Sequence, residues 1–389
     1  MTHCKICGEW NCEKHNFKIG KIKKIDQFSG SSPPEIFVGR WNYPNVYTGI
    51  LSPQEYGDKQ ILSSPELWHK NNLSIKQITS NRNELIYGRT QNHIKKRQTK
   101  FLDVLKEVAM THKSVAIDFK LKKKINSINH PDKRVPLISK AAPVQSARLE
   151  ENTKIKSKVD YLVNDTDVKS TISMQELYKS GIQTSNIIKL LSAGLLGLKK
   201  NRKLVPTRWS ITATDDTLSK QKLPKIKLNS TISEFQVFHS EYLGNHYEFL
   251  LLPDKYSFEV IEMHTNYSQT GIFWQDYESF FPRKKYADNV TGGYYAVRLP
   301  LTEHLEKIKR QAQCLVIREV KPEYNVPCGV GILRETSRDA FSKKPEKFNT
   351  LKEALDKIQT RLTQPITNYT TKSQLLKNFG KQKRLNDFI

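Results

Sequence analysis

Three cysteines and a histidine lie close together near the start of the chain. Cys4, Cys7, Cys12 and His15 have the spacing C-x2-C-x4-C-x2-H. Two close pairs of this kind supply three thiolates and an imidazole to one tetrahedral zinc ion. Since all four ligand positions are filled, we expect a closed, structural zinc knuckle with no open position for catalysis. His3 is an alternative ligand that the spacing leaves open.

The last residues of the sequence have the pattern of a peptide that binds a sliding clamp. Gln382, Leu385, Phe388 and Ile389 match Q-x-x-h-x-x-a-a. One helical turn brings Leu385 and the final pair onto one face, which can fill an apolar pocket while Gln382 hydrogen-bonds beside it. Ile389 replaces the usual second aromatic residue, which weakens the expected fit. The alternative is a tail that frays in water or folds back on its own domain.

A third group combines a guanidinium, aromatic rings and amides in one loop. Arg40, Trp41, Asn42 and Asn45 follow the strand-like residues 36–38. A planar guanidinium beside aromatic rings suits a stacked base or a phosphate, so we expect a nucleotide or DNA contact here. The alternative is a loop whose aromatic residues cap the core.

Two other stretches are candidates for the same kind of binding. Arg208 precedes Trp209 in the segment 204–212, which we expect to be strand-like. Gly292 and Gly293 allow backbone amides to approach a phosphate, with Arg298 nearby in an expected strand.

Signatures of known enzyme classes are missing from the sequence. It has no P-loop, dinucleotide-binding, zinc-protease or nucleophile-elbow motif. We therefore assign no catalytic residues, and Glu303, Glu319, Glu323 and Glu335 are the carboxylates that we would test first. Glu319 and Glu335 belong to Arg-Glu pairs at the ends of expected strands, and Glu323 follows the first pair. Charged residues at the end of a strand are usually only solvated.

The charge of the chain favours a polyanionic partner. Its 64 Lys and Arg residues against 39 Asp and Glu residues give a net charge of +25. Such an excess favours DNA or RNA through phosphate neutralisation, although a lysine-rich composition also raises the isoelectric point without any such partner.

The sequence predicts a cytoplasmic, nucleoid-associated protein with no membrane segment. The residues after Met1 contain no apolar signal region, and the most apolar stretch, 187–198, contains Lys189 and is too short for a bilayer. The five cysteines follow metal-site usage and not a disulfide framework.

The pattern of apolar residues predicts an α+β fold with a mixed, largely antiparallel sheet. Helices are expected at 99–109, as a pair over 173–194 with a capping box of Ser173 and Glu176, at 301–312 and after Thr350. The helical pair fits either a helix-turn-helix or an ordinary core hairpin. Strands are expected at 234–243, 246–253, 257–263, 292–300, 313–320 and 328–335. The expected parts are a zinc knuckle (1–17), an N-terminal α/β part (30–217), a sheet-rich part (232–365) and a flexible basic tail (366–389).

Several longer blocks resemble one family. "IFVGRWNYPNVYTGILSP", "LVPTRWSIT", "GGYYAVRLP" and "IREVKPEYNVPCGVGILRE", together with the knuckle and the C-terminal peptide, resemble the archaeal Nre family of DNA-repair proteins. The resemblance implies a role in DNA-damage repair and association with a sliding clamp through the four C-terminal residues named above. It carries over no catalytic residues. An enzyme acting on DNA or a nucleotide (a nuclease, or a nucleotidyl or ADP-ribosyl transferase), with a site near Arg40–Asn45 and Gly292–Arg298, is the alternative, and a pure protein-binding adaptor is a third possibility.

Overall fold

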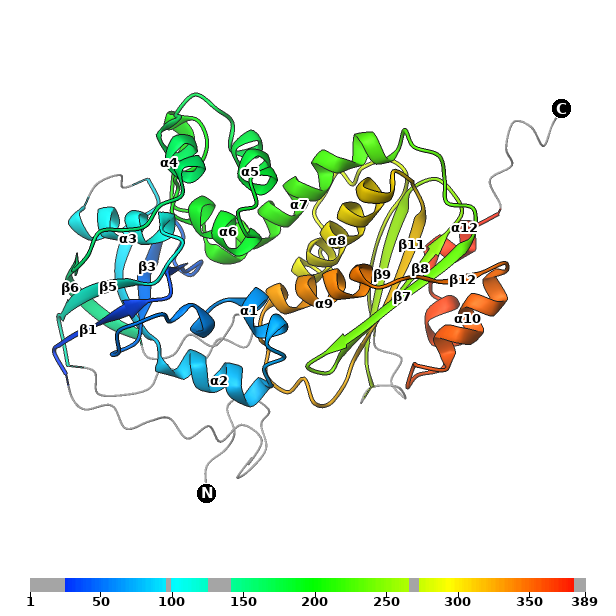
Figure 1. Cartoon of the computed structure of the whole chain (residues 1–389), viewed down its shortest axis with the longest axis horizontal. Coiled ribbons are helices and arrows are strands. Elements are labelled where there is room, and N and C mark those ends of the chain that lie inside the picture. Colours follow the sequence, from blue (N-terminus) through cyan, green and yellow to red (C-terminus); the bar gives the residue numbers. More distant parts are fainter. Residues whose placement is uncertain (1–24, 96–98, 125–140, 266–272, 381–389) are drawn as a thin grey trace, which may run out of the picture. The chain divides into compact units, whose positions relative to one another are not determined.

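The computed structural model describes residues 25–95, 99–124, 141–265 and 273–380 (Figure 1). The chain divides into two compact units, the first formed by Met1–Leu218 and Asn325–Gly329 and the second by Ser219–Tyr324 and Val330–Ile389. The division falls inside helix α7 (Thr207–Ile226). The expected strand over 204–212 is therefore wrong, because most of this segment forms the first turns of α7.

A six-stranded sheet organises the first unit, with the order β1-β5-β6-β4-β3-β2. All neighbouring strands are antiparallel except β4 and β6, which run parallel. The strands are β1 (Gln27–Ser32), β2 (Glu35–Val38), β3 (Asn45–Ser52), β4 (Ile86–His93), β5 (Val115–Leu121) and β6 (Ala141–Leu149).

The first unit also contains short helices: η1 (Gln60–Leu62), α1 (Pro65–Lys70), α2 (Ile75–Glu84), α3 (Lys100–Met110), α4 (Ser157–Asn164), α5 (Ser170–Lys179), α6 (Thr184–Ser192) and η2 (Lys199–Asn201). The expected helix at 99–109 is confirmed as α3, whose Thr99 hydroxyl accepts a hydrogen bond from the Leu102 N–H. The helical pair is confirmed as α5 and α6, but its expected cap is wrong. α5 begins earlier, at Ser170, so that Ser173 is buried inside the helix.

A second six-stranded sheet, with the order β10-β9-β11-β8-β7-β12, organises the second unit. Its strands are antiparallel except for the parallel pair β9 and β11. The strands are β7 (Phe235–Tyr242), β8 (Asn245–Leu252), β9 (Ser257–His264), β10 (Trp274–Glu278), β11 (Gln313–Val320) and β12 (Glu346–Phe348). The expected mixed, largely antiparallel α+β fold is thus confirmed.

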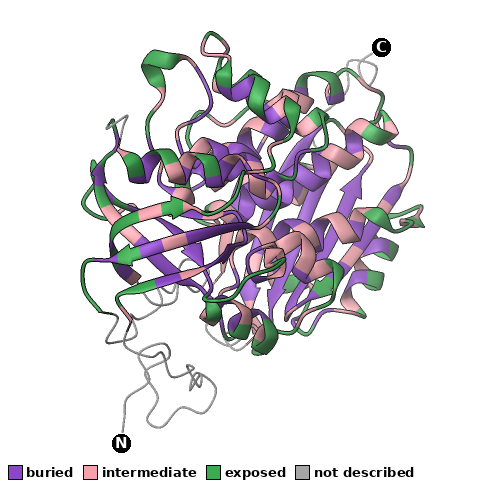
Figure 2. Ribbon diagram, turned by 60° about the vertical axis from the view of Figure 1, so that its left-hand side comes forward, coloured by how far each residue is buried: buried purple, intermediate pink, exposed green. Residues whose placement is uncertain are grey.

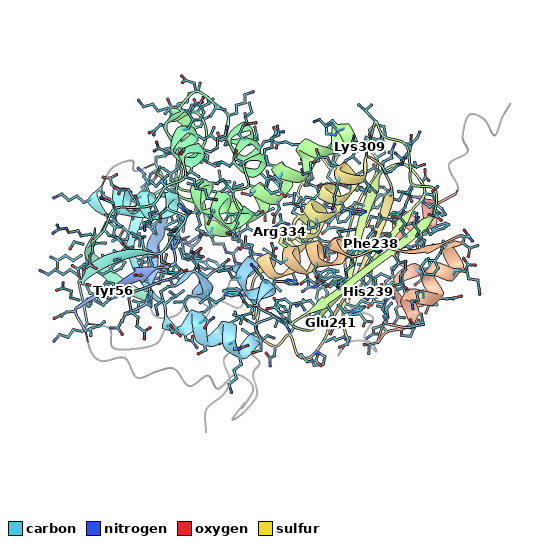
Figure 3. All side chains as sticks on the ribbon, viewed as in Figure 1. Tyr56, Phe238, His239, Glu241, Lys309 and Arg334 are labelled. Atoms are coloured by element: carbon cyan, nitrogen blue, oxygen red, sulfur yellow. The ribbon has the colours of Figure 1, made fainter. Side chains whose placement is uncertain are left out.

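Helices cover both faces of this second sheet, whose central strands are almost entirely buried (Figure 2). On one face, side chains such as Phe238 and Phe249 pack with α8 (Gly292–Ile308) and α9 (Val330–Ser342). On the other face, Leu250 and Ile317 pack with residues of α10 (Leu351–Gln359), α11 (Thr367–Thr370) and α12 (Gln374–Asn378). Successive residues point to opposite faces, so that Phe238 packs with α8 and α9 whereas the neighbouring His239 lies near Glu346 of β12 (both positions are labelled in Figure 3).

Two segments that we expected to be strands are helices. Residues 292–300 form the first half of α8, and residues 330–335 open α9. Most of the first half of α8 is buried, including Arg298 and Pro300. A helix that is apolar on all sides lacks the one-sided pattern of a surface helix, so its sequence resembles a buried strand. No helix among the described residues is long and apolar enough to cross a membrane.

Candidate nucleic-acid interface

The turn between β2 and β3 projects aromatic side chains from the first unit. Gly39 donates its N–H to the Tyr47 carbonyl at 2.8 Å, and Asn45 donates to the Asn42 carbonyl at 2.7 Å. These bonds close the hairpin. Asn42 has a φ of 60°, a left-handed conformation that asparagine tolerates better than most residues. The turn residues 41–45 are all exposed.

The start of α7 is fixed beside this hairpin. The Val38 N–H donates to the Thr207 hydroxyl at 2.9 Å, and the Ser192 and Thr207 hydroxyls lie 3.0 Å apart. Because Thr207 is the first residue of α7, these contacts hold the first helical turn next to β2. Trp209 then lies against Tyr43, with 5.2 Å between the ring centroids.

Two arginines lie over the neighbouring rings. The Arg40 guanidinium is 4.6 Å from the centroid of the Trp41 ring, and that of Arg89 is 4.1 Å from the Tyr47 ring. We call Trp41, Tyr43, Tyr47, Trp209, Arg40 and Arg89 the aromatic strip. Its four rings are 65%, 43%, 37% and 45% exposed, in that order.

Buried residues support the strip from beneath. On one face of the hairpin, Val38 and Val46 belong to a core cluster with Ile94, Leu102 and Leu204. The core therefore holds the backbone from which the exposed rings project.

On the other face of the β2–β3 hairpin, the Tyr87 hydroxyl donates hydrogen bonds to the carbonyls of Phe37 and Tyr47 at 3.1 and 3.3 Å. The ring of Tyr87 must cross β3 to reach them, and Gly49 leaves the space. A Cβ on Gly49 would lie 2.6 Å from the Tyr87 ring. This contact fixes the backbone from which Tyr47 projects.

A basic cleft lies close to the strip. This cavity of about 250 Å³ is lined by apolar residues, by one acidic residue, Asp103, and by four cationic residues. The cationic residues are Lys106, Lys199, Arg202 and Lys203. Ile94 joins the cleft to the hairpin, since it donates to the Pro44 carbonyl at 3.0 Å and accepts from the Leu204 N–H at 2.9 Å.

The strip and the cleft together have the chemistry of a surface for nucleic acid. Exposed rings can stack on bases, while arginine and lysine side chains bind phosphates. Exposed polar groups of Asn42, Asn45 and Gln91 lie on the same hairpin and its neighbour β4. The guanidinium of Arg202 is held by the carbonyls of Gly197, Val163 and Asp165 at 2.6–2.7 Å, which stiffens one wall of the cleft.

The structure places the predicted binding residues in two groups. Arg40, Trp41, Asn42 and Asn45 share the β2–β3 hairpin, and Arg208 is next to Trp209 in α7. The second group, comprising Gly292, Gly293 and Arg298, belongs to the second unit.

Arg298 is buried in an ion pair of the second unit. It is 1% exposed, and its guanidinium binds Glu278 at 2.7 Å and the Ser219 hydroxyl at 3.1 Å. The Tyr256 hydroxyl donates to the same Glu278 at 2.8 Å, and burial raises the pKa of Tyr256 above its ordinary value. This arrangement stabilises the core around α8, and we do not propose a ligand site at Arg298.

The carboxylates considered for catalysis also have structural partners. Glu303 of α8 binds Arg338 of α9 at 2.9–3.1 Å and so connects the two helices, and Glu335 binds the same Arg338 within α9 at 2.9 Å. The expected strand end at Arg334 and Glu335 is wrong because both residues lie in α9. Glu323 is exposed.

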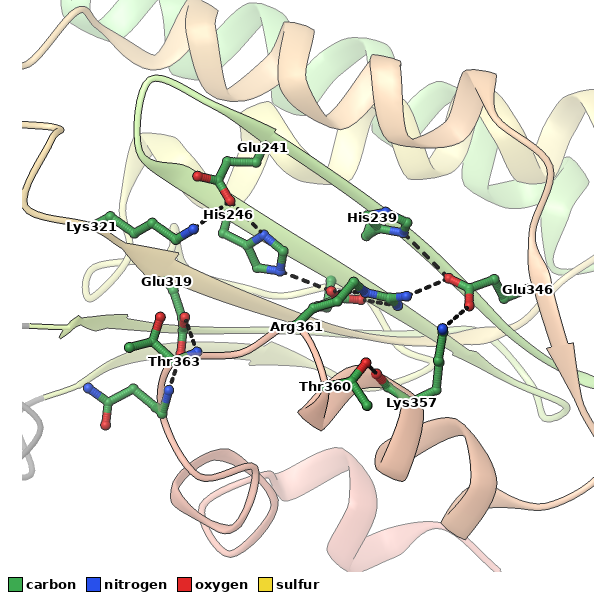
Figure 4. Close-up of polar contacts among 12 residues, drawn as sticks. His239, Glu241, His246, Glu319, Lys321, Glu346, Lys357, Thr360, Arg361 and Thr363 are labelled. Carbon is green, nitrogen blue, oxygen red and sulfur yellow. Dashed lines mark hydrogen bonds and ion pairs between the residues drawn. The ribbon is translucent and has the colours of Figure 1, made fainter.

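Buried glutamates on the second sheet fix the C-terminal helices. Glu319 accepts from the N–H groups of Thr363 and Gln364 at 2.8 and 2.7 Å (Figure 4). Glu259 accepts from the Ser373 hydroxyl at 2.5 Å and from the Gln374 and Leu375 N–H groups at 2.9 and 3.0 Å. Glu259 thus satisfies donors at the start of α12, whereas Glu319 holds the segment between α10 and α11.

A chain of polar contacts continues beside them (Figure 4). His246 binds Glu241 through Nδ1 at 3.1 Å and Glu248 through Nε2 at 2.9 Å. Arg361 binds Glu248 with two nitrogens at 2.7 and 2.9 Å, and Glu346 with a third at 2.6 Å. This network attaches the segment after α10 to strand β8.

The zinc and clamp-binding residues lie outside the described residues. This applies to Cys4, Cys7, Cys12 and His15 and to Gln382, Leu385, Phe388 and Ile389. Within the described ranges, no group of three or more His, Cys, Asp or Glu side chains is arranged to hold a metal ion. Cys314 and Cys328 are buried, and burial raises the pKa of both thiols, that of Cys328 to about 12.

Tyr47 and Arg89 belong to the strip but were not predicted from the sequence. The alternation of β3 places Tyr47 on the solvent side, between buried Val46 and Thr48. An aromatic residue at an outward position of an alternating strand was the available signal. Its pairing with Arg89 depends on the register of β4, which the sequence does not reveal.

The fold and the strip thus describe a two-unit α+β protein with an exposed surface suited to nucleic acid. The family model "Archaeal Nre, N-terminal" matches residues 2–270, and "Archaeal Nre, C-terminal" matches residues 278–388. The chain therefore belongs to the archaeal Nre family, which confirms the resemblance.

Curated relatives match over nearly their whole length. The DNA repair protein NreB of Archaeoglobus fulgidus is 35% identical over 92% of this chain and 91% of its own, and NreA of the same organism is 34% identical over 93% of both. The DNA repair protein NreA of Haloferax volcanii is 32% identical over 90% of this chain and 86% of its own. No solved structure matches the chain significantly.

Proposed function

We propose that this protein is a DNA-repair factor that associates with DNA through the aromatic strip and is recruited to the replication sliding clamp by its C-terminal peptide. The names of its relatives support the repair role. The strip is the single observation that carries the contact with DNA, because four rings with two guanidiniums over them remain exposed on a fixed hairpin.

The expected affinity comes from two terms. Stacking of one base on an aromatic side chain contributes roughly 1–3 kcal/mol. Phosphates in the basic cleft would release counterions when they meet Lys106, Lys199 and Lys203, so that binding weakens with salt. The net charge of +25 adds a general attraction for a polyanion.

The clamp contact is assigned to Gln382, Leu385, Phe388 and Ile389 on their pattern alone. What supports it in the structure is the attachment of the preceding segment. Leu375 in α12 is 1% exposed, and Glu259 holds the start of that helix. The peptide therefore follows a segment that is packed on the second sheet. This segment ends only a few residues before Gln382.

We assign a structural zinc ion to Cys4, Cys7, Cys12 and His15. Three thiolates and one imidazole form a complete tetrahedral set, in which the metal stabilises a short segment that has few apolar residues. The assignment rests on ligand type and spacing.

Recruitment to the clamp would strengthen the contact with DNA. Two weak contacts made by one molecule act as an intramolecular pair, which raises the apparent affinity without any new contact. A repair factor held on the clamp would thus remain near the DNA that the clamp encircles.

Calorimetric titration of the clamp into the full-length protein and into a truncation that lacks residues 381–389 tests the recruitment. We expect heat of binding from the full-length protein only, with equal melting temperatures for both proteins. Equal binding by both proteins, or early melting of the truncation, would show that the tail belongs to the fold and would contradict the clamp assignment.

A further inference from the structure

The loop Ser279–Tyr286, which follows β10 in the second unit, exposes two aromatic side chains. Phe281 is 76% exposed and Tyr286 is 57% exposed. The Tyr286 ring meets the buried Tyr295 ring edge to face, with centroids 5.5 Å apart. Such a contact fixes the ring while much of its surface remains in water.

A buried carboxylate and a half-buried guanidinium hold the base of this loop in place. The Arg283 guanidinium donates to the Tyr277 carbonyl at 2.8 Å and pairs with Asp276 at 3.1 Å. The second oxygen of Asp276 accepts from the Asn289 and Val290 N–H groups at 3.2 and 2.6 Å. The loop is therefore preorganised, and a ligand that binds its tip would lose little entropy in ordering it.

The surface around the two rings is positively charged. Lys284 and Lys285 lie between them in sequence and are exposed, and the Lys220 ammonium is 5.8 Å from the centroid of the Tyr286 ring. The acidic residues just before the loop, Asp276 and Glu278, are buried and paired with Arg283 and Arg298. Their charge is neutralised inside the unit, so the tip presents an excess of positive charge, and Asp288 is the exposed acid that follows it.

We propose that the loop Ser279–Tyr286 is a second nucleic-acid contact, which binds single-stranded nucleic acid. Bases stack on Phe281 and Tyr286, and phosphates bind Lys284 and Lys285. A duplex suits the loop less well because its bases already stack on one another and present no free faces. The inference rests on the proposed association with DNA. Its residues belong to the second unit, whereas the aromatic strip belongs to the first.

The test measures the fluorescence anisotropy of a labelled oligothymidine of about 20 nucleotides and of the same length of duplex. We expect Phe281→Ala to bind the single strand roughly tenfold more weakly than the wild type and Phe281→Trp to restore the affinity. Binding to the duplex should change less than about twofold. Phe281 is so exposed that its replacement should leave the melting temperature unchanged.

Tyr161→Ala is the matched control. Tyr161 is 61% exposed and lies 5.6 Å from the Lys158 ammonium, but Asp160 is exposed beside it and Lys158 pairs with Glu176. It is thus an exposed ring near a lysine without the excess of positive charge, and its removal should leave the affinity unchanged.

The outcomes separate this inference from the proposed function. If the wild type binds neither oligonucleotide, the association with DNA itself is wrong, and this inference falls with it. If the wild type binds and Trp41→Ala weakens binding, but Phe281→Ala and Tyr286→Ala bind as the wild type does, only the second contact is wrong. The proposal would also be wrong if vesicles of anionic lipid retained the wild type but not Phe281→Ala, while both proteins bound DNA with the same affinity.

Discussion

The rings of Tyr43 and Trp209 lie 5.2 Å apart, although one belongs to a hairpin turn and the other to the first turn of helix α7. The link between these elements is the hydrogen bond from the Val38 N–H to the Thr207 hydroxyl. The aromatic strip thus depends on one side chain that is not itself aromatic.

Thr207→Val tests this dependence. Valine has nearly the shape of threonine but cannot accept the bond from Val38, whose N–H would be left unpaired. We expect a loss of about 1–2 kcal/mol in the free energy of unfolding and weaker binding to DNA, measured by urea unfolding and anisotropy. Thr212→Val is the control, because the Thr212 hydroxyl makes only a long bond of 3.5 Å to the Arg208 carbonyl. Equal stability of the two variants would contradict the account.

Arg298→Met should destabilise the second unit. The variant would leave the carboxylate of Glu278 buried at 3% exposure without its cation. Removal of one partner of a buried ion pair typically costs about 3–5 kcal/mol. We expect a large fall in the thermal midpoint, and removal of both charges in Arg298→Met/Glu278→Met should recover part of it.

The exposed Arg310 provides the comparison for this variant. Arg310→Met removes an arginine from just after the same helix and should change the stability by less than about 0.5 kcal/mol. A midpoint for Arg298→Met as high as that of Arg310→Met would show that the buried pair does not stabilise the unit.

The sequence predicted the elements that have a one-sided pattern. α3 is apolar on one face only, and its apolar positions were visible in the sequence, whereas the Thr99 cap was not predicted. The strands of the second sheet at 234–263 and 313–320 were also visible as apolar runs. In each case the local pattern agrees with the final environment of the segment.

The sequence did not predict the segments that are buried on all sides, or those whose conformation depends on long-range contacts. Tyr294, Tyr295 and Val297 favour a strand locally, and Pro300 is disfavoured inside a helix, yet the segment is helical because helix packing buries all four residues. The strip was only half predicted for a related reason. Trp41 was visible in its loop, but the approach of Trp209 required α7, which the sequence did not reveal.

The pKa of His304 gives a pH dependence of stability. Burial against Phe238 and Phe341, together with the charge of Lys307, lowers the pKa of His304 to about 4. In the unfolded chain the pKa is about 6.5, so the unfolded state takes up the proton first as the pH falls. Stability should therefore be lost between about pH 6.5 and pH 4, by up to about 3 kcal/mol from this residue.

His304→Phe should remove this contribution. Urea unfolding at pH 7.5 and at pH 5 would show a smaller loss of stability on acidification for the variant than for the wild type. Equal losses for the two proteins would mean that His304 is protonated in the folded protein as readily as in the unfolded chain.

The reactivity of the five cysteines tests the zinc assignment. Cys314 and Cys328 are buried with raised pKa values, so a thiol reagent should not modify them in the folded protein. With zinc bound, Cys4, Cys7 and Cys12 should also react slowly. A chelator should expose these three thiols, and a denaturant should expose all five.

Metal analysis completes this test. We expect about one zinc ion per chain, which Cys7→Ser should lose. Three fast-reacting thiols before any chelator is added, with no zinc in the purified protein, would contradict the assignment.

Binding of single-stranded DNA by Trp41→Ala and Trp209→Ala tests the central claim most directly. Trp41 is 65% and Trp209 45% exposed, so we expect their removal to leave the fold intact, and Tyr161→Ala again serves as the control. We predict that each strip variant binds roughly 5- to 100-fold more weakly at a fixed salt concentration, while the control binds as the wild type does. Unchanged affinity in both tryptophan variants would contradict the claim that the aromatic strip is the surface that binds DNA.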